Sequence, residues 1–178
     1  MDIHFVHEAM ENDIVCAFLR KLEREEVLPT VGRVPGVDLA DYYRLIEKRF
    51  ANPKIGDTIR RLCLDGSNRQ PKFIVPTIAS ALAAGRSFAG LALVSALWCR
   101  YCFGTTDSGA VIEPNDPNWD ELQLHARKAK DDPMAWLGMR EVYGAVAEAP
   151  AYRKAFAQAL ETVWEVGAQE AQKRYLAG

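Results

Sequence analysis

The sequence lacks an excess of positive charge, and it lacks long uninterrupted apolar runs. Its 178 residues hold 22 Lys and Arg against 24 Asp and Glu, for a net charge of −2, so no basic surface that could follow a phosphate backbone is expected. The apolar stretch 73–103 is interrupted by Pro76 and Gly85, and neither half reaches the roughly 20 residues that a membrane span needs. We therefore predict neither a nucleic-acid partner nor a membrane partner.

Cysteine is also scarce. The four cysteines, Cys16, Cys63, Cys99 and Cys102, are too few for a disulfide framework in a chain of this size, so reduced thiols are expected. Residues 1–10 contain acidic residues and no long apolar run, unlike a secretory signal. Both observations favour a cytoplasmic protein.

Recognisable metal and cofactor motifs are missing too. Cys99 and Cys102 form a CxxC at the end of an apolar segment without a second pair, which favours core cysteines over zinc ligands. His4 and His7 lack a third ligand nearby, so we predict no metal site. The acidic run 23–26 is typical of a solvated helix face. No glycine-rich phosphate loop and no nucleophile motif are present, so no cofactor-binding or nucleophilic residue is predicted within this chain.

Helical periodicity is what the sequence does show. Asn12 and Asp38 each precede an amphipathic stretch and are expected to cap helices. Residues 87–103 are apolar almost all round, which predicts a central buried helix. Pro150 opens a long final helix, in which apolar residues recur at helical spacing. No alternating run is long enough for a strand, so the fold class is predicted to be all-α, as one domain over residues 1–178.

Shorter helices are expected between these landmarks. The pattern predicts them over residues 55–64, 73–84, 119–130 and 133–143, with a long turn-rich loop over 104–118.

Charge is concentrated in residues 52–77, NPKIGDTIRRLCLDGSNRQPKFIVPT, directly before an apolar segment. Asp57, Arg61 and Asp65 are spaced i, i+4, i+8 and so fall in one row of the predicted helix. The turn 65–68 that follows supplies further polar groups. Such a row is either a surface ion-pair ladder or a site for a polyoxygenated or anionic ligand, because the arginine donor fork suits both.

The same segment resembles the substrate domain of the polyol-specific long-chain dehydrogenases, the mannitol 2-dehydrogenase family. The resemblance extends over essentially the whole chain and includes EEVLPTV (25–31), DLADYYRLIEKRFANP (38–53), SALWCRYCFGTTDSG (95–109) and VWEVGAQEAQKRYLAG (163–178). It implies a helical C-terminal domain with a fold similar to the C-terminal domain of 6-phosphogluconate dehydrogenase. It also implies an N-terminal Rossmann domain that binds NAD and that these residues do not include.

The resemblance also implies where the catalytic residues of such an enzyme lie. In the family, a Lys-x4-Asn-x2-His motif carries proton transfer and oxyanion stabilisation during hydride transfer to NAD, and it lies upstream of residue 1. No asparagine here has a lysine five residues before it, so no catalytic residue is expected in this chain. Taken alone, the 178 residues are expected to be catalytically silent.

The resemblance places two substrate-binding residues, Arg61 and Arg69, which would hold hydroxyl groups of a polyol or ketose. Relatives often carry lysine at the second position. From spacing, we expect Asp65 to orient Arg61 across one helical turn. Two alternatives stay open. One is a sugar-acid reductase of the same superfamily, of the fructuronate type, and the other is a non-enzymatic helical interaction module.

Overall fold

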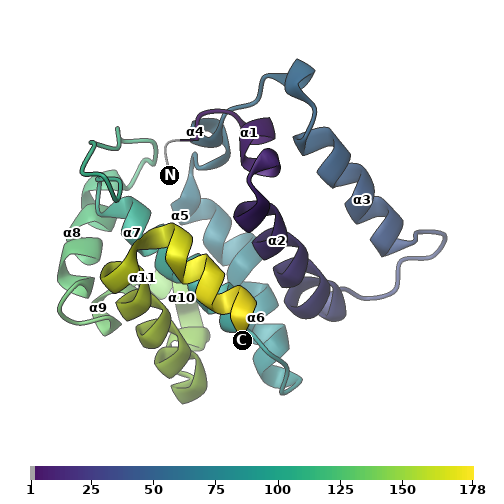
Figure 1. The fold of residues 1–178 in the computed structure, drawn as a ribbon. Helices are drawn as coiled ribbons and strands as arrows, with labels where there is room; N and C mark the ends of the chain where they lie inside the picture. The colour runs from purple at the N-terminus through teal and green to yellow at the C-terminus, as the bar shows by residue number, and fades with distance from the viewer. Residues whose placement is uncertain (1–2) are drawn as a thin grey trace.

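Helices build the structure throughout residues 3–178, the part of the chain that the computed structural model describes (Figure 1). Extended pairing in this part is limited to two isolated bridges, Phe5 with Thr58 and Thr105 with Val111. The predicted all-α fold class is confirmed. None of the helices in the described residues is both long and apolar enough to cross a membrane.

Helix α7 (Ala89–Cys102) is the centre of the core, as predicted. Eight of its residues are buried, and it packs most extensively against the final helix α11 (Pro150–Ala177). The buried hydroxyl of Tyr152 on α11 donates to Ser95 on α7 at 2.9 Å. Because apolar residues surround α7 on all sides, its sequence shows no amphipathic stripe.

The final helix is long, as predicted, but it is kinked. Gly167 has φ 81° and ψ 170°, so the helix is interrupted there. Asp107, from the loop after α7, accepts a hydrogen bond from the Ala168 N–H at 2.8 Å and so caps the second part of α11. A Cβ on Gly167 would lie 2.9 Å from that carboxylate, which together with the positive φ explains why glycine occupies the kink.

A buried carboxylate joins three distant segments of the fold. Helix α2 (Asp13–Leu22) continues into a π-helical turn, η1 (Glu23–Val27), where Glu26 is only 2% exposed. Glu26 accepts hydrogen bonds from the N–H groups of Gly90 and Leu91 at the start of α7 and from the hydroxyl of Tyr175. The prediction of a solvated face over residues 23–26 is therefore wrong at Glu26, which acts as a helix cap from a remote segment.

Six further elements complete the body of the fold outside residues 31–83. They are α1 (Val6–Glu11), η2 (Leu28–Thr30), α8 (Trp119–Ala129), α9 (Met134–Leu137), α10 (Arg140–Tyr143) and η5 (Gly144–Glu148). The helices expected over 119–130 and 133–143 are present, the second as two single turns. The loop expected over 104–118 is present as well.

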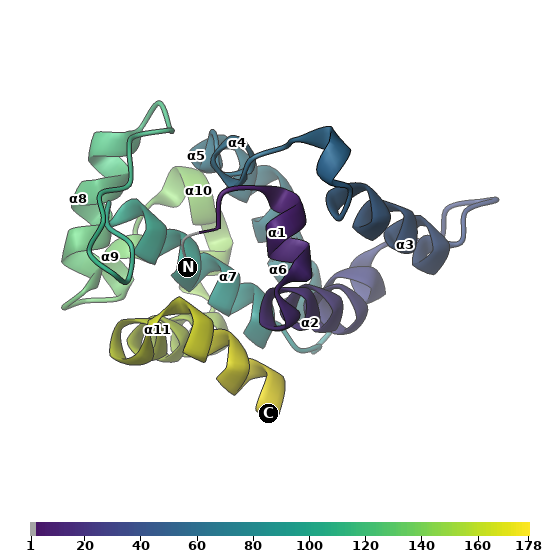
Figure 2. The ribbon, with the colours of Figure 1, turned by 45° about the horizontal axis from the view of Figure 1, so that its top comes forward.

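Helix α3 (Leu39–Phe50) stands away from the body of the molecule (Figures 1 and 2). The side chain of Asp38 accepts hydrogen bonds from the N–H groups of Ala40 and Asp41, so the predicted cap is confirmed, as is the cap at Asn12. None of the residues of α3 is buried. Its contacts with the body are made mainly to α1 and to the turn η3 (Pro53–Ile55).

Candidate functional site

The charged segment 52–77 folds as a series of short helical turns. They are η3, α4 (Ile59–Leu62), α5 (Gly66–Arg69), η4 (Gln70–Ile74) and α6 (Val75–Ala83). The single helix predicted over 55–64 is therefore wrong. Gly56 adopts φ 64°, and Thr58 caps α4 through its side chain, so the helix starts four residues later than expected. Pro76 lies in the first turn of α6, as predicted.

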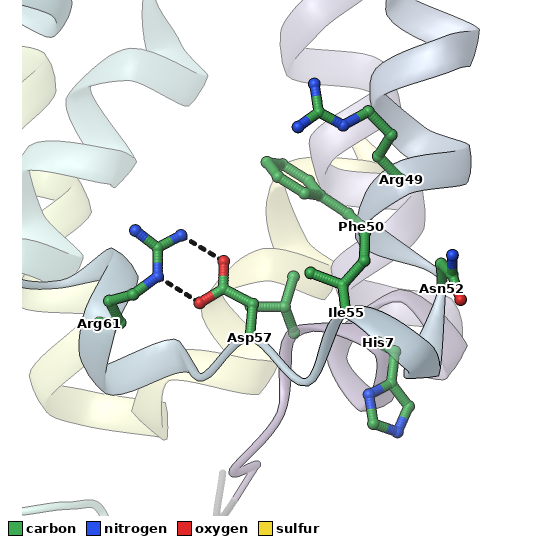
Figure 3. Close-up of a pocket in the computed structure, with 8 residues that line it drawn as sticks. His7, Arg49, Phe50, Asn52, Ile55, Asp57 and Arg61 are labelled. Atoms are coloured by element: carbon green, nitrogen blue, oxygen red, sulfur yellow. Dashed lines mark hydrogen bonds and ion pairs between the residues drawn. The ribbon is translucent and has the colours of Figure 1, made fainter.

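Arg61 forms a two-point ion pair with Asp57, in which its Nε and Nη2 donate to the two carboxylate oxygens (Figure 3). The Arg61 side chain is 58% exposed, whereas that of Asp57 is 16% exposed. The hydrogen bonds from Arg61 lower the pKa of the Asp57 carboxyl, and the Thr58 N–H contributes in the same direction. The pair therefore stays ionised and fixes the guanidinium at the surface.

The expected contact between Asp65 and Arg61 is not the one that the structure contains. Asp65 instead accepts a hydrogen bond from the side-chain amide of Asn68 at 2.6 Å. Its backbone is left-handed, with φ 60° and ψ 39°, which turns the chain sharply between α4 and α5 and ends the helical row. The carboxylate that contacts Arg61 is that of Asp57, one turn before it.

Arg69 is brought back onto the end of α4. Its Nη1 donates to the carbonyl of Leu62 at 3.2 Å, so its guanidinium lies beside the helix that carries Arg61. The ion pairs found among residues 3–178 do not include Arg69. The two predicted substrate-binding arginines therefore share one edge of the fold but differ in their partners. Arg61 is paired with the Asp57 carboxylate, whereas Arg69 is paired with no carboxylate among residues 3–178.

Hydrogen bonds to the loop 104–118 stabilise the turn between the two arginines. Asp116 accepts hydrogen bonds from both the N–H and the hydroxyl of Ser67, at 2.8 and 2.7 Å. Arg60 donates to the carbonyls of Glu113 and Pro114. This support was not predicted, because its partners lie about 50 residues apart in sequence and carry no local pattern.

Close packing against α7 also fixes the position of this turn. A Cβ added to Gly66 would lie 2.6 Å from the indole nitrogen of Trp98 on α7. The Trp98 ring itself packs edge-on against Trp136, with centroids 4.8 Å apart. Glycine at position 66 thus allows the turn to pack directly against the aromatic core. This packing holds the backbone between the two arginines rigid.

A shallow hollow of about 100 Å³ opens beside the Arg61–Asp57 pair (Figure 3). Its walls come from α1, from the end of α3, from the turn η3 and from α4 with the residues just before it: Val6, His7, Arg49, Phe50, Asn52, Ile55, Asp57 and Arg61. The lining combines aliphatic and aromatic carbon with guanidinium donors and a carboxylate acceptor. Such a surface can bind a small molecule that carries several hydroxyl groups on a carbon chain.

The cysteines and histidines that the sequence did not favour as metal ligands lie in different parts of the fold. Cys99 and Cys102 are buried in the core, as predicted, and burial raises the pKa of both thiols. Among the described residues, no group of three His, Cys, Asp or Glu side chains is arranged to hold a metal ion. His7 lines the hollow.

Comparison with known proteins identifies the family. The model of the mannitol dehydrogenase C-terminal domain matches residues 1–164. The mannitol 2-dehydrogenase of Cereibacter sphaeroides is 59% identical over 177 residues, which is 99% of this chain and 37% of that protein. The mannitol 2-dehydrogenase of Aspergillus terreus is 38% identical over 79% of this chain and 28% of its own length.

Solved structures agree with this assignment. The Pseudomonas fluorescens mannitol 2-dehydrogenase, solved as a ternary complex with NAD and D-mannitol, superposes with a TM-score of 0.92 at 32% identity, over 98% of this chain and 36% of that one. A substrate-free D-sorbitol dehydrogenase, with a TM-score of 0.83 at 20% identity over 96% of this chain and 35% of that one, shares the fold. The chain spans about a third of the length of these relatives. It belongs to the mannitol dehydrogenase family and corresponds to the C-terminal domain of that family.

Proposed function

We propose that this chain is the substrate-binding part of an NAD-dependent polyol 2-dehydrogenase, which interconverts a mannitol-type polyol and its ketose. In this proposal Arg61 and Arg69 bind hydroxyl groups of the substrate, and Asp57 positions Arg61. The proposed enzyme includes an N-terminal Rossmann domain. A cytoplasmic location, suggested by the unpaired cysteines, belongs to the same proposal.

The observation that carries the proposal is the neutral Arg61–Asp57 pair at the edge of the hollow. The carboxylate engages two of the five guanidinium N–H groups, which leaves three donors next to an acceptor and no net charge. A neutral polyol needs such alternating donors and acceptors. An anionic substrate would gain little from an arginine that is already paired, and it would approach the Asp57 carboxylate at a cost.

The chemistry of hydride transfer comes from NAD when it is bound. A dinucleotide site of the Rossmann type needs a strand, a glycine-rich turn and a helix, and the described residues contain no such unit. We therefore assign no residue of this chain to NAD. In the proposal, the contribution of this chain is orientation: its arginines hold the carbon chain of the polyol so that the reacting carbinol faces the N-terminal domain of the proposed enzyme.

A sugar-acid reductase is the second candidate, and one observation favours it. Arg69 has no carboxylate partner among the described residues, so it could pair with the carboxylate of a substrate such as fructuronate. The neutral pair at Arg61 makes this the weaker candidate.

The two candidates differ in the substrate that a full-length enzyme turns over. We suggest a chimeric full-length protein, in which these residues replace the matching residues of the Cereibacter sphaeroides mannitol 2-dehydrogenase. Mannitol and arabinitol oxidation with NAD, and fructuronate reduction with NADH, are then followed by absorbance. The proposal predicts polyol turnover and much weaker turnover of fructuronate. A preference for fructuronate would support the reductase, and no turnover of any of the three would support an interaction module.

A further inference from the structure

The exposed apolar side chains of this protein are concentrated in one place, which we call the α3 arm (residues 31–56). Of the eleven large hydrophobic residues that are exposed in the described chain, seven lie in this arm: Val31, Val34, Val37, Tyr42, Leu45, Phe50 and Ile55. Single exposed apolar residues are ordinary in a soluble protein, but a contiguous group of them marks a surface that binds something.

Two sides of α3 are apolar, and the body of the molecule covers only one. Tyr43 and Ile46 are half-buried against the body, where burial raises the pKa of Tyr43 to about 12. Tyr42 and Leu45, at i and i+3, lie on a neighbouring side and are 56% and 55% exposed. Packing of an apolar side is what stabilises most helices in proteins, so the side of α3 formed by Tyr42 and Leu45 is available for further packing.

The uncovered side of the arm is continuous with the hollow beside Arg61. Arg49 follows Leu45 by four residues, and it lines the hollow together with Phe50 and Ile55. Both of these apolar residues belong to the exposed group as well. A protein surface that covers the arm would therefore also form a further wall of the hollow and exclude water from it.

The length of the relatives indicates which protein surface covers the arm. This chain matches 37% of the Cereibacter sphaeroides protein and corresponds to its C-terminal domain, so most of such a protein precedes these residues. The preceding chain would join the described part beside α4, which carries Arg61, because the carbonyl of His4 accepts a hydrogen bond from the Ile59 N–H at 2.9 Å. The first helix after this junction, α1, contacts α3.

We propose that the α3 arm is the docking surface for the preceding, cofactor-binding part of a full-length protein, which packs on Tyr42 and Leu45 and closes the hollow beside Arg61. The proposal rests on the proposed function only in assuming that such a part exists. The arm holds five basic and three acidic residues in a chain of net charge −2. The facing surface is therefore expected to be apolar with acidic residues around it.

Hydrogen exchange of the α3 amides tests the proposal, with the 178-residue chain compared to the chimeric full-length protein defined above. We expect exchange of residues 39–50 to slow at least tenfold in the full-length protein, while exchange in α8 stays unchanged. Equal exchange of α3 in both proteins would overturn the proposal. This comparison needs no substitution, so it does not depend on a variant that folds.

Two matched substitutions sharpen the test. Leu45 on α3 and Leu124 on α8 are both leucines within a helix, and they are 55% and 52% exposed. In the full-length protein, Leu45→Glu is expected to restore fast exchange of α3 and to raise the KM for mannitol, whereas Leu124→Glu is expected to change neither. Equal effects of the two substitutions would contradict the proposal.

A second copy of the chain is the competing occupant. It predicts that the isolated chain dimerises in light scattering, that Leu45→Glu makes it monomeric, and that the full-length protein leaves α3 unprotected. That combination would overturn the proposal. A full-length protein that oxidises mannitol with an unprotected arm would refute the docking surface alone. Protection of the arm without activity would refute the proposed function alone.

Discussion

Gly66→Ala offers a sharp test of how the site is supported. The substitution places a methyl group 2.6 Å from the Trp98 indole nitrogen and 3.2 Å from the neighbouring ring carbon. The indole cannot retreat freely, because its ring packs against the fully buried Trp136. Either the indole or the turn that carries Arg69 must therefore shift.

The expected magnitude follows from two opposing terms. Forcing a methyl group into a well-packed position costs about 1–3 kcal/mol. Alanine gains up to about 1 kcal/mol over glycine as a helical residue, and Gly66 begins a helical turn. We expect a net loss of about 1–2 kcal/mol in the free energy of unfolding, which corresponds to a fall of roughly 0.5–1 M in the urea midpoint for a slope near 2 kcal/mol/M.

Urea unfolding followed by circular dichroism measures this loss, and Gly138→Ala is the matched control. A Cβ at Gly138 would meet its nearest atoms at 3.5 Å, an ordinary contact, so its effect is expected to stay within about 0.5 kcal/mol. Trp98→Phe removes the nitrogen that makes the closest approach. In a double-mutant cycle it should recover part of the loss caused by Gly66→Ala. A Gly66→Ala variant as stable as Gly138→Ala would refute the reasoning.

Three further predictions concern stability. Glu26→Ala leaves the N–H groups of Gly90 and Leu91 without their acceptor and should cost about 3 kcal/mol in urea unfolding, whereas the exposed Glu25→Ala should stay within about 0.5 kcal/mol. Asp107→Ala removes the cap at the kink of α11 and should speed amide exchange over residues 168–177 by about fivefold, for a cap worth about 1 kcal/mol. No change there would contradict the capping role. Burial raises the pKa of Tyr43 and of Tyr101 to about 12, against about 10 when unfolded. The folded state then keeps protons that the unfolded state loses, so stability should fall as pH rises from about 10 to 12. Tyr43→Phe should lessen that fall, as measured by urea unfolding at each pH.

Local signals in the sequence were sufficient for much of the fold. The caps at Asn12 and Asp38 were predictable because a capping side chain bonds to N–H groups two or three residues away. Helix α7 was predictable because its own apolar residues lie on all sides of the helix, which is typical of a buried helix. The final helix was predictable in length, but its interruption at Gly167 was not, since the stabilising carboxylate of Asp107 comes from a loop 60 residues earlier.

The candidate site was less predictable than the fold. The resemblance indicated Arg61 and Arg69, and the structure brings the guanidinium of Arg69, from α5, beside the helix α4 that carries Arg61. The spacing of Asp57 and Asp65 around Arg61 is symmetric, so sequence alone could not choose between them. The left-handed backbone at Asp65 decides the matter. Asp116 and the exposed side of α3 were missed because both depend on which distant segments lie nearby.

The central claim is that Arg61 holds a polyol hydroxyl, and the KM for mannitol of an Arg61→Ala variant tests it most directly. The variant is made in the chimeric full-length protein. Its control is Arg174→Ala, since Arg174 is likewise about half exposed and paired with a carboxylate, that of Glu165, but lies on α11. Loss of hydrogen bonds from a charged donor, worth about 1.5–3 kcal/mol, predicts a KM raised roughly 10- to 150-fold and a lower kcat/KM. The Kd for NAD is expected to stay unchanged. A KM equal to that of the Arg174→Ala control would contradict the account.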